Sequence, residues 1–292
     1  MPDAVPSRGG DPPGPSADAA LLELTGISKS FGRVVVAHNL SLTVGAGDLV
    51  GIVGPNGAGK SSLFGLIAGD LASSAGEITF DGDRVTRLDA AARCRLGIGR
   101  TFQVPKPFGA MTVFENVLVA VQQGSGLRRR PSYAAASAIV DLTGLTGDAN
   151  NPAERLALLS RKRLELARAL ATGPRLLLLD EVAGGLTDPE VAQLATIIGS
   201  VRDEGVAIIW IEHVVHALTA AVHRLLCLYS GVFIGDGAPA EVLALPAVRE
   251  VFLGTEVSAS LHMPAAEAGD TPAPAGPASP DAGADTVRQD SR

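Results

Sequence analysis

Nine consecutive residues carry the strongest chemical pattern in this sequence. The stretch "GPNGAGKSS" fits the phosphate-loop pattern G-x-x-x-x-G-K-[ST], and it joins the apolar run 49–53 to an expected helix over about 60–68. Phosphates need closely spaced backbone N–H groups, and glycines let the chain wrap that tightly. The helix N-terminus adds the positive end of its dipole. The residues predicted to bind nucleotide phosphates are Gly54, Pro55, Asn56, Gly57, Ala58, Gly59, Lys60, Ser61 and Ser62.

Two side chains of this loop have distinct expected roles. Lys60 would reach the β- and γ-phosphates, and the Ser61 hydroxyl would bind Mg²⁺. The alternative is an ordinary glycine turn before a helix. A lysine in the first helical turn opposes the helix dipole, which disfavours that alternative.

Two carboxylates follow a second apolar run, in "RLLLLDE" (175–181). Asp180 at the end of the predicted strand can hold Mg²⁺, and Glu181 can orient a water molecule for in-line attack on a γ-phosphate. Alone, this pattern is also that of an ordinary strand end with solvated acids. Together with the phosphate loop, it predicts a nucleotide-hydrolysing site.

A histidine ends a third apolar run, "AIIWIEH" (207–213). Because the carboxyl ends of parallel strands meet at one sheet edge, His213 would lie near Lys60 and could hydrogen-bond the γ-phosphate. Taken alone, it is more often a strand-terminal histidine with no role.

The composition limits the kinds of partner. The chain has 292 residues, 46% hydrophobic and 4% aromatic, with a formal charge of −7, which gives no general attraction for nucleic acid. No apolar run approaches the ~18 residues of a membrane span, and the first residues do not resemble a secretory signal. We therefore expect a soluble protein of a reducing compartment, with Cys94 and Cys227 as buried thiols.

The order of apolar runs predicts one folded unit between two tails. Residues 1–19 and 257–292 are rich in Pro, Gly and Ala, and we expect both to be disordered. Between them, one domain over 20–256 begins with β-like alternation and continues with strands alternating with helices, which predicts a parallel sheet covered on both faces. A helical segment over about 104–172 is predicted as an insertion. The remaining expected elements are an edge strand at 77–80, strands at 175–179, 206–211 and 223–228, and helices at 188–204 and 213–221.

In this order, the motifs resemble an ATP-binding cassette, the ATPase subunit of ABC transporters, over about residues 21–254. The resemblance implies an α/β fold, a P-loop NTPase (RecA-like) core with an N-terminal antiparallel β-subdomain and an inserted helical subdomain. It implies that Phe31 stacks on adenine, and that Gln103 in "GIGRTFQ" reaches Mg²⁺ and senses the membrane partner. The stretch "GGLTDPE" (184–190) would contact a second cassette, with ATP bound between the two.

Within that family, the chain is similar to the ATP-binding subunits of importers for branched-chain, or more generally hydrophobic, amino acids. "RLELARALATGPRLLLLDE", "IEHVVHAL", "PAVREVFLG" and the insertion "QQGSGLRRRPSYAAASAIVDLTGL" carry this resemblance. It implies integral membrane permease subunits, an indirect solute-binding partner, and a cytoplasmic location at the inner face of the cell membrane. Lipopolysaccharide-exporter cassettes share much of this pattern but usually lack the insertion. Its Arg128–Arg130 run is either a solvated loop or a contact for headgroups or a permease.

The signature motif departs from the family pattern, as do "LTDPE" and Val182, which stands where proline is usual. In "LALLSRKRLELARAL" (156–170), the serine and glycine of the signature motif, which faces the nucleotide of the second cassette, fall on Ala157 and Leu159. Leu159 brings a side chain where close backbone approach is needed, and Ser160 is a candidate substitute N-cap or phosphate donor. We hypothesise that the chain hydrolyses its own ATP but completes a weaker site for its partner. A heterodimer with a second cassette would tolerate this; a slow homodimer is the competing version.

Two other functions are weighed against the transport ATPase. A nucleotide-dependent regulatory ABC protein with weak hydrolysis is the alternative that the degenerate signature motif favours. Soluble ABC proteins of DNA repair or translation carry a long coiled-coil insertion or two cassettes, and this chain has neither. Its acidic balance also argues against nucleic acid.

Overall fold

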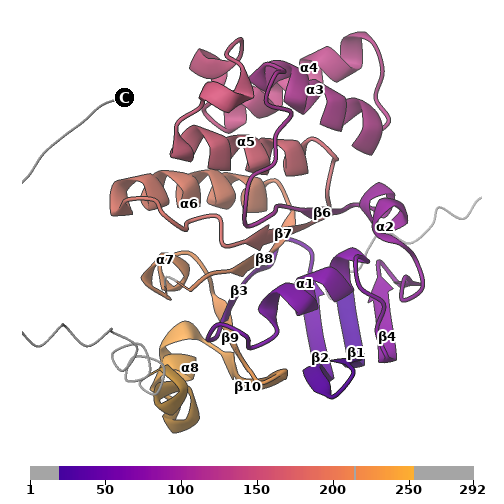
Figure 1. Cartoon of the computed structure of the whole chain (residues 1–292), viewed down its shortest axis with the longest axis vertical. Coiled ribbons are helices and arrows are strands. Elements are labelled where there is room, and N and C mark those ends of the chain that lie inside the picture. Colours follow the sequence, from indigo (N-terminus) through magenta and orange to yellow (C-terminus); the bar gives the residue numbers. More distant parts are fainter. Residues whose placement is uncertain (1–19, 214, 253–292) are drawn as a thin grey trace, which may run out of the picture.

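A mainly parallel sheet forms the centre of the molecule (Figure 1). The computed structural model describes residues 20–213 and 215–252. The strand order is β10-β9-β3-β8-β7-β6, and only β10 runs antiparallel to its neighbour. Four of its strands are almost entirely apolar, as expected for a sheet covered on both faces. The strands are β3 (Leu49–Val53), β6 (Ile98–Arg100), β7 (Leu176–Asp180), β8 (Ala207–Ile211), β9 (Arg224–Tyr229) and β10 (Val232–Gly237).

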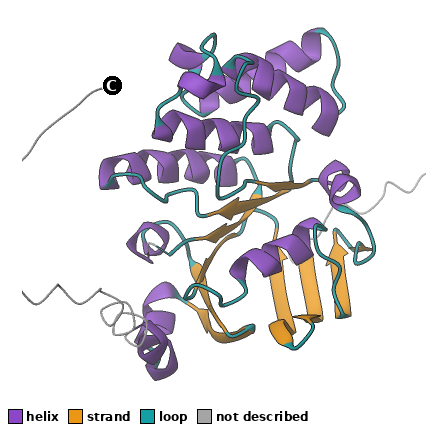
Figure 2. Ribbon diagram, viewed as in Figure 1, coloured by secondary structure: helices purple, strands orange, loops and turns teal. Residues whose placement is uncertain are grey.

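An antiparallel sheet packs against one side of this core across helix α1 (Lys60–Ala68) (Figures 1 and 2). Its order is β2-β1-β4-β5. The expected edge strand at 77–80 belongs to β4, but the edge prediction is wrong because the two residues of β5 pair with its outer side. The strands are β1 (Ala20–Phe31), β2 (Val34–Gly45), β4 (Ala75–Phe80) and β5 (Asp83–Arg84).

The other face of the central sheet is covered by helices, and a separate helical layer lies beyond them (Figure 2). That layer is inserted between β6 and β7, and its apolar interior is built around Val117, Val140 and Leu164. It comprises α3 (Val113–Gly124), α4 (Arg130–Leu142) and α5 (Leu158–Leu170), with short 3-10 turns at Thr146–Asp148 and Ala153–Arg155. The remaining helices are α2 (Ala90–Leu96), α6 (Asp188–Asp203), α7 (Val215–Thr219) and α8 (Pro239–Ala244).

This architecture confirms the predicted fold class, with an antiparallel β-subdomain, a parallel core and an inserted helical subdomain. The helix expected at 213–221 is shorter, and the sequence interpretation missed β6, β10, α2 and α8. Of the two thiols, Cys227 is buried, but Cys94 is partly exposed, which corrects the expectation for it. The predicted tails 1–19 and 257–292 lie outside the described residues. Within residues 20–213 and 215–252, every helix is too short or too polar to cross a bilayer.

Candidate nucleotide-binding site

The phosphate loop connects β3 to α1, and two of its glycines have no room for a side chain. A Cβ atom at Gly54 would lie 2.1 Å from the Leu228 carbonyl oxygen, and one at Gly59 would lie 2.3 Å from that of Val36. Gly59 also has φ +106°, a left-handed conformation that favours glycine. The first turn of α1 has no acidic residue and no side-chain cap, so its positive dipole end is suited to an anion.

The ammonium of Lys60 lies inside the curve of the loop. Its Nζ donates to the carbonyl oxygens of Gly54 at 2.6 Å and Pro55 at 3.0 Å, and the residue is buried. Burial lowers the pKa of Lys60, while the carboxylates of Glu181 and Asp180 act in the opposite direction. The loop therefore surrounds a cation as well as backbone N–H groups, a combination suited to polyphosphate.

A cavity of about 340 Å³ opens on the loop and collects residues that are far apart in the sequence. Gln103, which follows β6, and Glu181, which follows β7, reach the same space as the start of α1. Its lining consists of Val36, Asn56, Gly57, Ala58, Gly59, Lys60, Ser61, Ser62, Gln103 and Glu181.

Glu181 lies close to two other predicted site residues, Gln103 and His213. Gln103 Nε2 donates to Glu181 Oε2 at 2.5 Å, and His213 Nδ1 lies 3.9 Å from the same oxygen. Neighbouring strands β7 and β8 pair Asp180 with Ile211, which brings Glu181 and His213 to one sheet edge, as predicted. A carboxylate beside an imidazole and an amide can orient a water molecule and accept its proton.

Asp180 binds an arginine that the sequence interpretation did not single out, and it does not line this cavity. Its Oδ2 accepts from Arg100 Nη2 at 3.1 Å, and Arg100 Nη1 donates to Asp70 at 2.7 Å. Burial raises the pKa of Asp180, and the charge and hydrogen bond of Arg100 oppose that shift. Arg100 stands in the quoted motif "GIGRTFQ", but no local signal links it to a residue 80 positions away.

Phe31 lies at the end of β1, outside the residues that line the cavity. It pairs with Val34 of β2, and Val36 on the same strand does line the cavity. The Phe31 ring is 50% exposed, with Lys29 Nζ 4.8 Å from its centroid. An exposed aromatic ring offers an apolar surface on which a base can stack.

The start of α5 differs from what we expected of the signature segment. The helix N-cap is Ala157, and no side chain caps it, so the prediction that Ser160 serves as a substitute N-cap is wrong. Ser160 is the third helical residue, and its hydroxyl donates to Asp148 Oδ2 at 3.0 Å. Leu159 is exposed. Leu158 is exposed as well, and its Cδ2 would lie 3.2 Å from a Cβ atom at Gly185.

A buried carboxylate that the sequence interpretation passed over supports the segment after Glu181. Glu212 is fully buried, and its Oε1 accepts from the Ala183 N–H at 2.7 Å and from Trp210 Nε1 at 3.1 Å. Its Oε2 has no hydrogen-bond partner among the described residues. Burial raises the pKa of Glu212, and the two hydrogen bonds oppose that effect.

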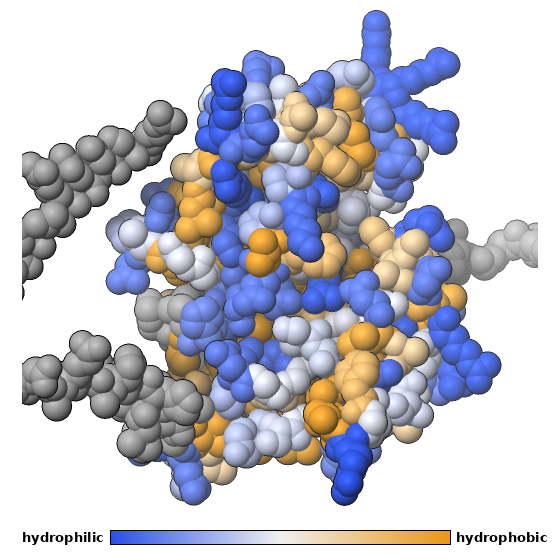
Figure 3. Space-filling model, viewed as in Figure 1, coloured by the Kyte–Doolittle hydropathy of each residue, from blue (hydrophilic) through white to orange (hydrophobic). Residues whose placement is uncertain are grey.

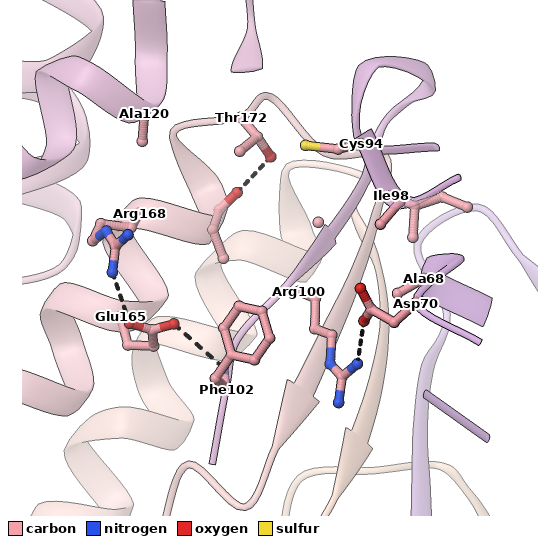
Figure 4. A pocket seen from close by; sticks show the side chains of 13 residues that line it. Ala68, Asp70, Cys94, Ile98, Arg100, Phe102, Ala120, Glu165, Arg168 and Thr172 are labelled. Atoms are coloured by element: carbon pink, nitrogen blue, oxygen red, sulfur yellow. Dashed lines mark hydrogen bonds and ion pairs between the residues drawn. The ribbon is translucent and has the colours of Figure 1, made fainter. Parts of the chain in front are cut away.

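A second cavity, of about 250 Å³, lies between α5 on one side and α2 and β6 on the other (Figure 4). Arg100, Phe102, Glu165 and Arg168 line it, and Cys94 lies at its border. Glu165 is buried, and its Oε1 accepts from the Phe102 N–H at 3.3 Å. This contact ties the helical layer to the loop that enters the first cavity.

Known proteins match both the sequence and the fold. The family model described as "ABC transporter" matches residues 37–184. The high-affinity branched-chain amino acid transport ATP-binding protein LivG of Salmonella typhimurium is 32% identical, over 80% of this chain and 98% of its own length. The lipopolysaccharide export system ATP-binding protein LptB of Escherichia coli is 31% identical, over 81% and 98%.

A solved ABC transporter cassette in its ADP conformation superimposes with a TM-score of 0.73. It is 27% identical, and the match covers 81% of this chain and 99% of that one. The family model spans half of the chain, and the LivG match spans most of it. The chain therefore belongs to the ATP-binding subunits of ABC transporters, the family that hydrolyses ATP to power transport.

Proposed function

We propose that this chain binds ATP with its phosphates in the 340 Å³ cavity and that Phe31 stacks on the adenine. The observation that carries the proposal is the convergence of Lys60, Gln103 and Glu181 on that one cavity. Lys60 would exchange its two carbonyl contacts for the β- and γ-phosphates. Replacement of Lys60 by Ala should weaken Mg-ATP binding at least about tenfold in equilibrium dialysis, because it removes the cation at the centre of the loop. Unchanged affinity would place the nucleotide elsewhere.

Two residues that line the cavity, together with Asp180 outside its lining, fit a magnesium ion. The Ser61 hydroxyl, the Gln103 amide oxygen and the Asp180 carboxylate are the oxygen donors that Mg²⁺ prefers, and a bound ion would neutralise phosphate charge. Asp180 would have to exchange Arg100 for the ion. Glu181 would accept the proton of the attacking water as the new O–P bond forms and the bond to the leaving ADP breaks. His213 would position the γ-phosphate from the same edge.

The transported solute is proposed from resemblance. The LivG match supports transport of branched-chain or other small hydrophobic amino acids, or of related small solutes. The LptB match, by contrast, is to an exporter ATPase. Loss of labelled leucine uptake on deletion of the gene, restored by the wild-type chain but not by Glu181→Gln, would support the importer. Uptake that is unchanged by deletion would point to another solute or to export.

Permease subunits are proposed to dock at the loop after β6. Large apolar side chains are exposed there, namely Phe102 (50%), Val104 (64%) and Phe108 (49%), beside the second cavity. The exposed Arg128–Arg130 run spans the end of the connection from α3 and the first residue of α4, and Figure 3 shows hydrophilic side chains extending from that end of the helical layer. A solvated loop and a headgroup or permease contact both fit that exposure. Through the permeases, we place the chain on the cytoplasmic side of the membrane, with a solute-binding protein as an indirect partner.

The proposed dimer is a heterodimer in which a second cassette supplies the better signature helix. Ser160 is bonded to Asp148, and two leucines occupy the start of α5, so this chain has little to offer a partner's γ-phosphate. A slow homodimer and a regulatory protein with weak hydrolysis are the alternatives that the same feature favours. Light scattering of Glu181→Gln with saturating Mg-ATP separates the two dimers: a monomer that binds ATP supports the heterodimer, and a stable dimer contradicts it. A turnover assay of the wild type tests the regulatory alternative.

A further inference from the structure

Helix α5 holds the loop that carries Gln103 through three charged side chains on one face. Lys162 Nζ donates to the Gln103 carbonyl at 3.3 Å, and Glu165 accepts from the Phe102 N–H at 3.3 Å. Arg168 Nη1 donates to the Lys106 carbonyl at 2.9 Å. The spacing of three residues places these side chains on one side of the helix. Figure 4 shows Glu165 and Arg168 on α5, with Glu165 directed toward Phe102 of that loop.

Lys162 differs from the other two because it also reaches the segment after β7. Its Nζ donates to the Glu181 carbonyl at 3.1 Å, so one ammonium binds the backbones of Gln103 and Glu181. The side chains of these two residues bind each other at 2.5 Å in the nucleotide cavity. The buried ammonium of Lys162 thus holds the backbone carbonyls of both residues whose side chains form this pair.

The backbone of Glu181 needs such support. Its φ is +49°, in the left-handed region that an L-residue other than glycine adopts at a cost. The Glu181 N–H donates to the Ile211 carbonyl at 3.0 Å. The Glu181 carbonyl accepts from Lys162 Nζ and from the Gly184 N–H, the latter at 3.3 Å. The conformation that turns the carboxylate into the cavity therefore depends on a few identifiable contacts.

The surroundings of Lys162 are those of a constrained charge rather than a solvated one. The residue is 6% exposed, and its pKa is lowered by burial, an effect opposed chiefly by the negative charge of Glu212. Burying an ammonium is costly unless it is hydrogen-bonded, as Lys162 is, and removing a buried charge leaves its partners uncompensated, so Lys162→Met is expected to lower the stability of the fold as well. Lys162→Arg, which keeps the charge, and hydrogen exchange measured loop by loop therefore separate the positioning of the two loops from the stability of the fold.

We propose that Lys162 is a positioning residue for ATP hydrolysis, which holds the carbonyls of Gln103 and Glu181 so that their side chains meet at the γ-phosphate position. This inference rests on the proposed function of those two residues. It also gives α5 a role within its own subunit: a movement of the helical layer changes the Gln103–Glu181 geometry through this ammonium.

The test compares Lys162→Met with Lys162→Arg and with the matched control Arg161→Met in the full-length chain. Arg161 is the preceding residue of α5, but it is exposed, and its guanidinium donates to the Glu154 carbonyl at 2.8 Å, away from both loops. Loss of a charged donor to two carbonyls should lower kcat about 10- to 100-fold and change the Kd for Mg-ATP less than about threefold. Lys162→Arg should recover at least about a third of the wild-type kcat, and Arg161→Met should match wild type.

Amide hydrogen exchange provides a readout that needs no turnover. In Lys162→Met, exchange should rise in peptides covering 101–106 and 181–186 and stay unchanged in 20–45. Wild-type kcat with unchanged exchange in both loops would overturn the proposal, as would a rise spread evenly over the chain. Wild-type turnover and its loss in Glu181→Gln test the proposed function without involving Lys162. Failure of the proposed function is therefore distinguishable from failure of the Lys162 proposal.

Discussion

The two glycines Gly57 and Gly59 of the phosphate loop should respond differently to alanine. Both have positive φ, +80° and +106°, so alanine at either costs about 1–2 kcal/mol of backbone strain. At Gly57 the added Cβ atom meets nothing within 4 Å, whereas at Gly59 it would lie 2.3 Å from the Val36 carbonyl oxygen. Relieving that overlap requires β2 or the loop to move, which adds about 1–3 kcal/mol.

A difference of about 2 kcal/mol between the variants corresponds to a gap of about 4–8 °C in Tm. Thermal unfolding without nucleotide measures this gap, and the Kd for Mg-ATP measures the consequence for binding. Gly59→Ala should also bind more weakly than Gly57→Ala, because the displaced backbone includes the N–H groups at the start of α1. Equal Tm values for the two variants would refute the argument that close approach, and not φ alone, requires glycine here.

Three further outcomes are expected. Ser160→Ala should change stability by less than about 1 kcal/mol and leave kcat within about twofold, since the hydroxyl binds Asp148; a large kcat loss in a phosphate-release assay would contradict this. Leu159→Gly should strengthen ATP-dependent self-association in light scattering, measured in a hydrolysis-deficient background, and no change would mean that the side chain is not the obstacle. Burial raises the pKa of Glu212, so above about pH 4.5 the folded wild type binds more protons than the unfolded chain, and its stability falls as pH rises. Glu212→Gln lacks this titration, so its stability should rise relative to that of the wild type over the same pH range. Urea unfolding at about pH 5 and pH 8 checks the sign, and a stability difference between variant and wild type that does not change with pH would contradict it.

The elements that patterns predicted well are those with a strong local constraint. Strand β3 and helix α1 match their expected bounds because an apolar run and a phosphate loop mark the end of one and the start of the other. Helix α6 begins where Thr187 and Glu190 form a cap, with the Thr187 N–H donating to Glu190 Oε2 at 2.8 Å. By contrast, β6 has three residues, and β10 contains two glycines. Neither strand therefore shows the alternation of apolar and polar residues from which a strand is predicted.

Lys60, Gln103 and Glu181 line one cavity, whereas the predicted site residues Phe31 and Asp180 lie outside its lining. The residues that support this site did not emerge from the sequence. Arg100, Lys162 and Glu212 each look like ordinary surface charges in a linear pattern. Their roles come from contacts across long separations, such as the 80 positions from Arg100 to Asp180. The expectation that Ser160 is the N-cap failed because the helix begins earlier, at Leu158, and the Ser160 hydroxyl inside its first turn donates to Asp148.

Phosphate release by the purified chain, measured for wild type and Glu181→Gln at saturating Mg-ATP, tests the central claim most directly. We predict turnover by the wild type and at least about a 100-fold lower kcat for the variant, with the Kd for Mg-ATP within about threefold, because the substitution removes the carboxylate that accepts the proton and leaves the phosphate loop intact. Equal rates for the two proteins would contradict the assignment of Glu181, and with it the catalytic site described above.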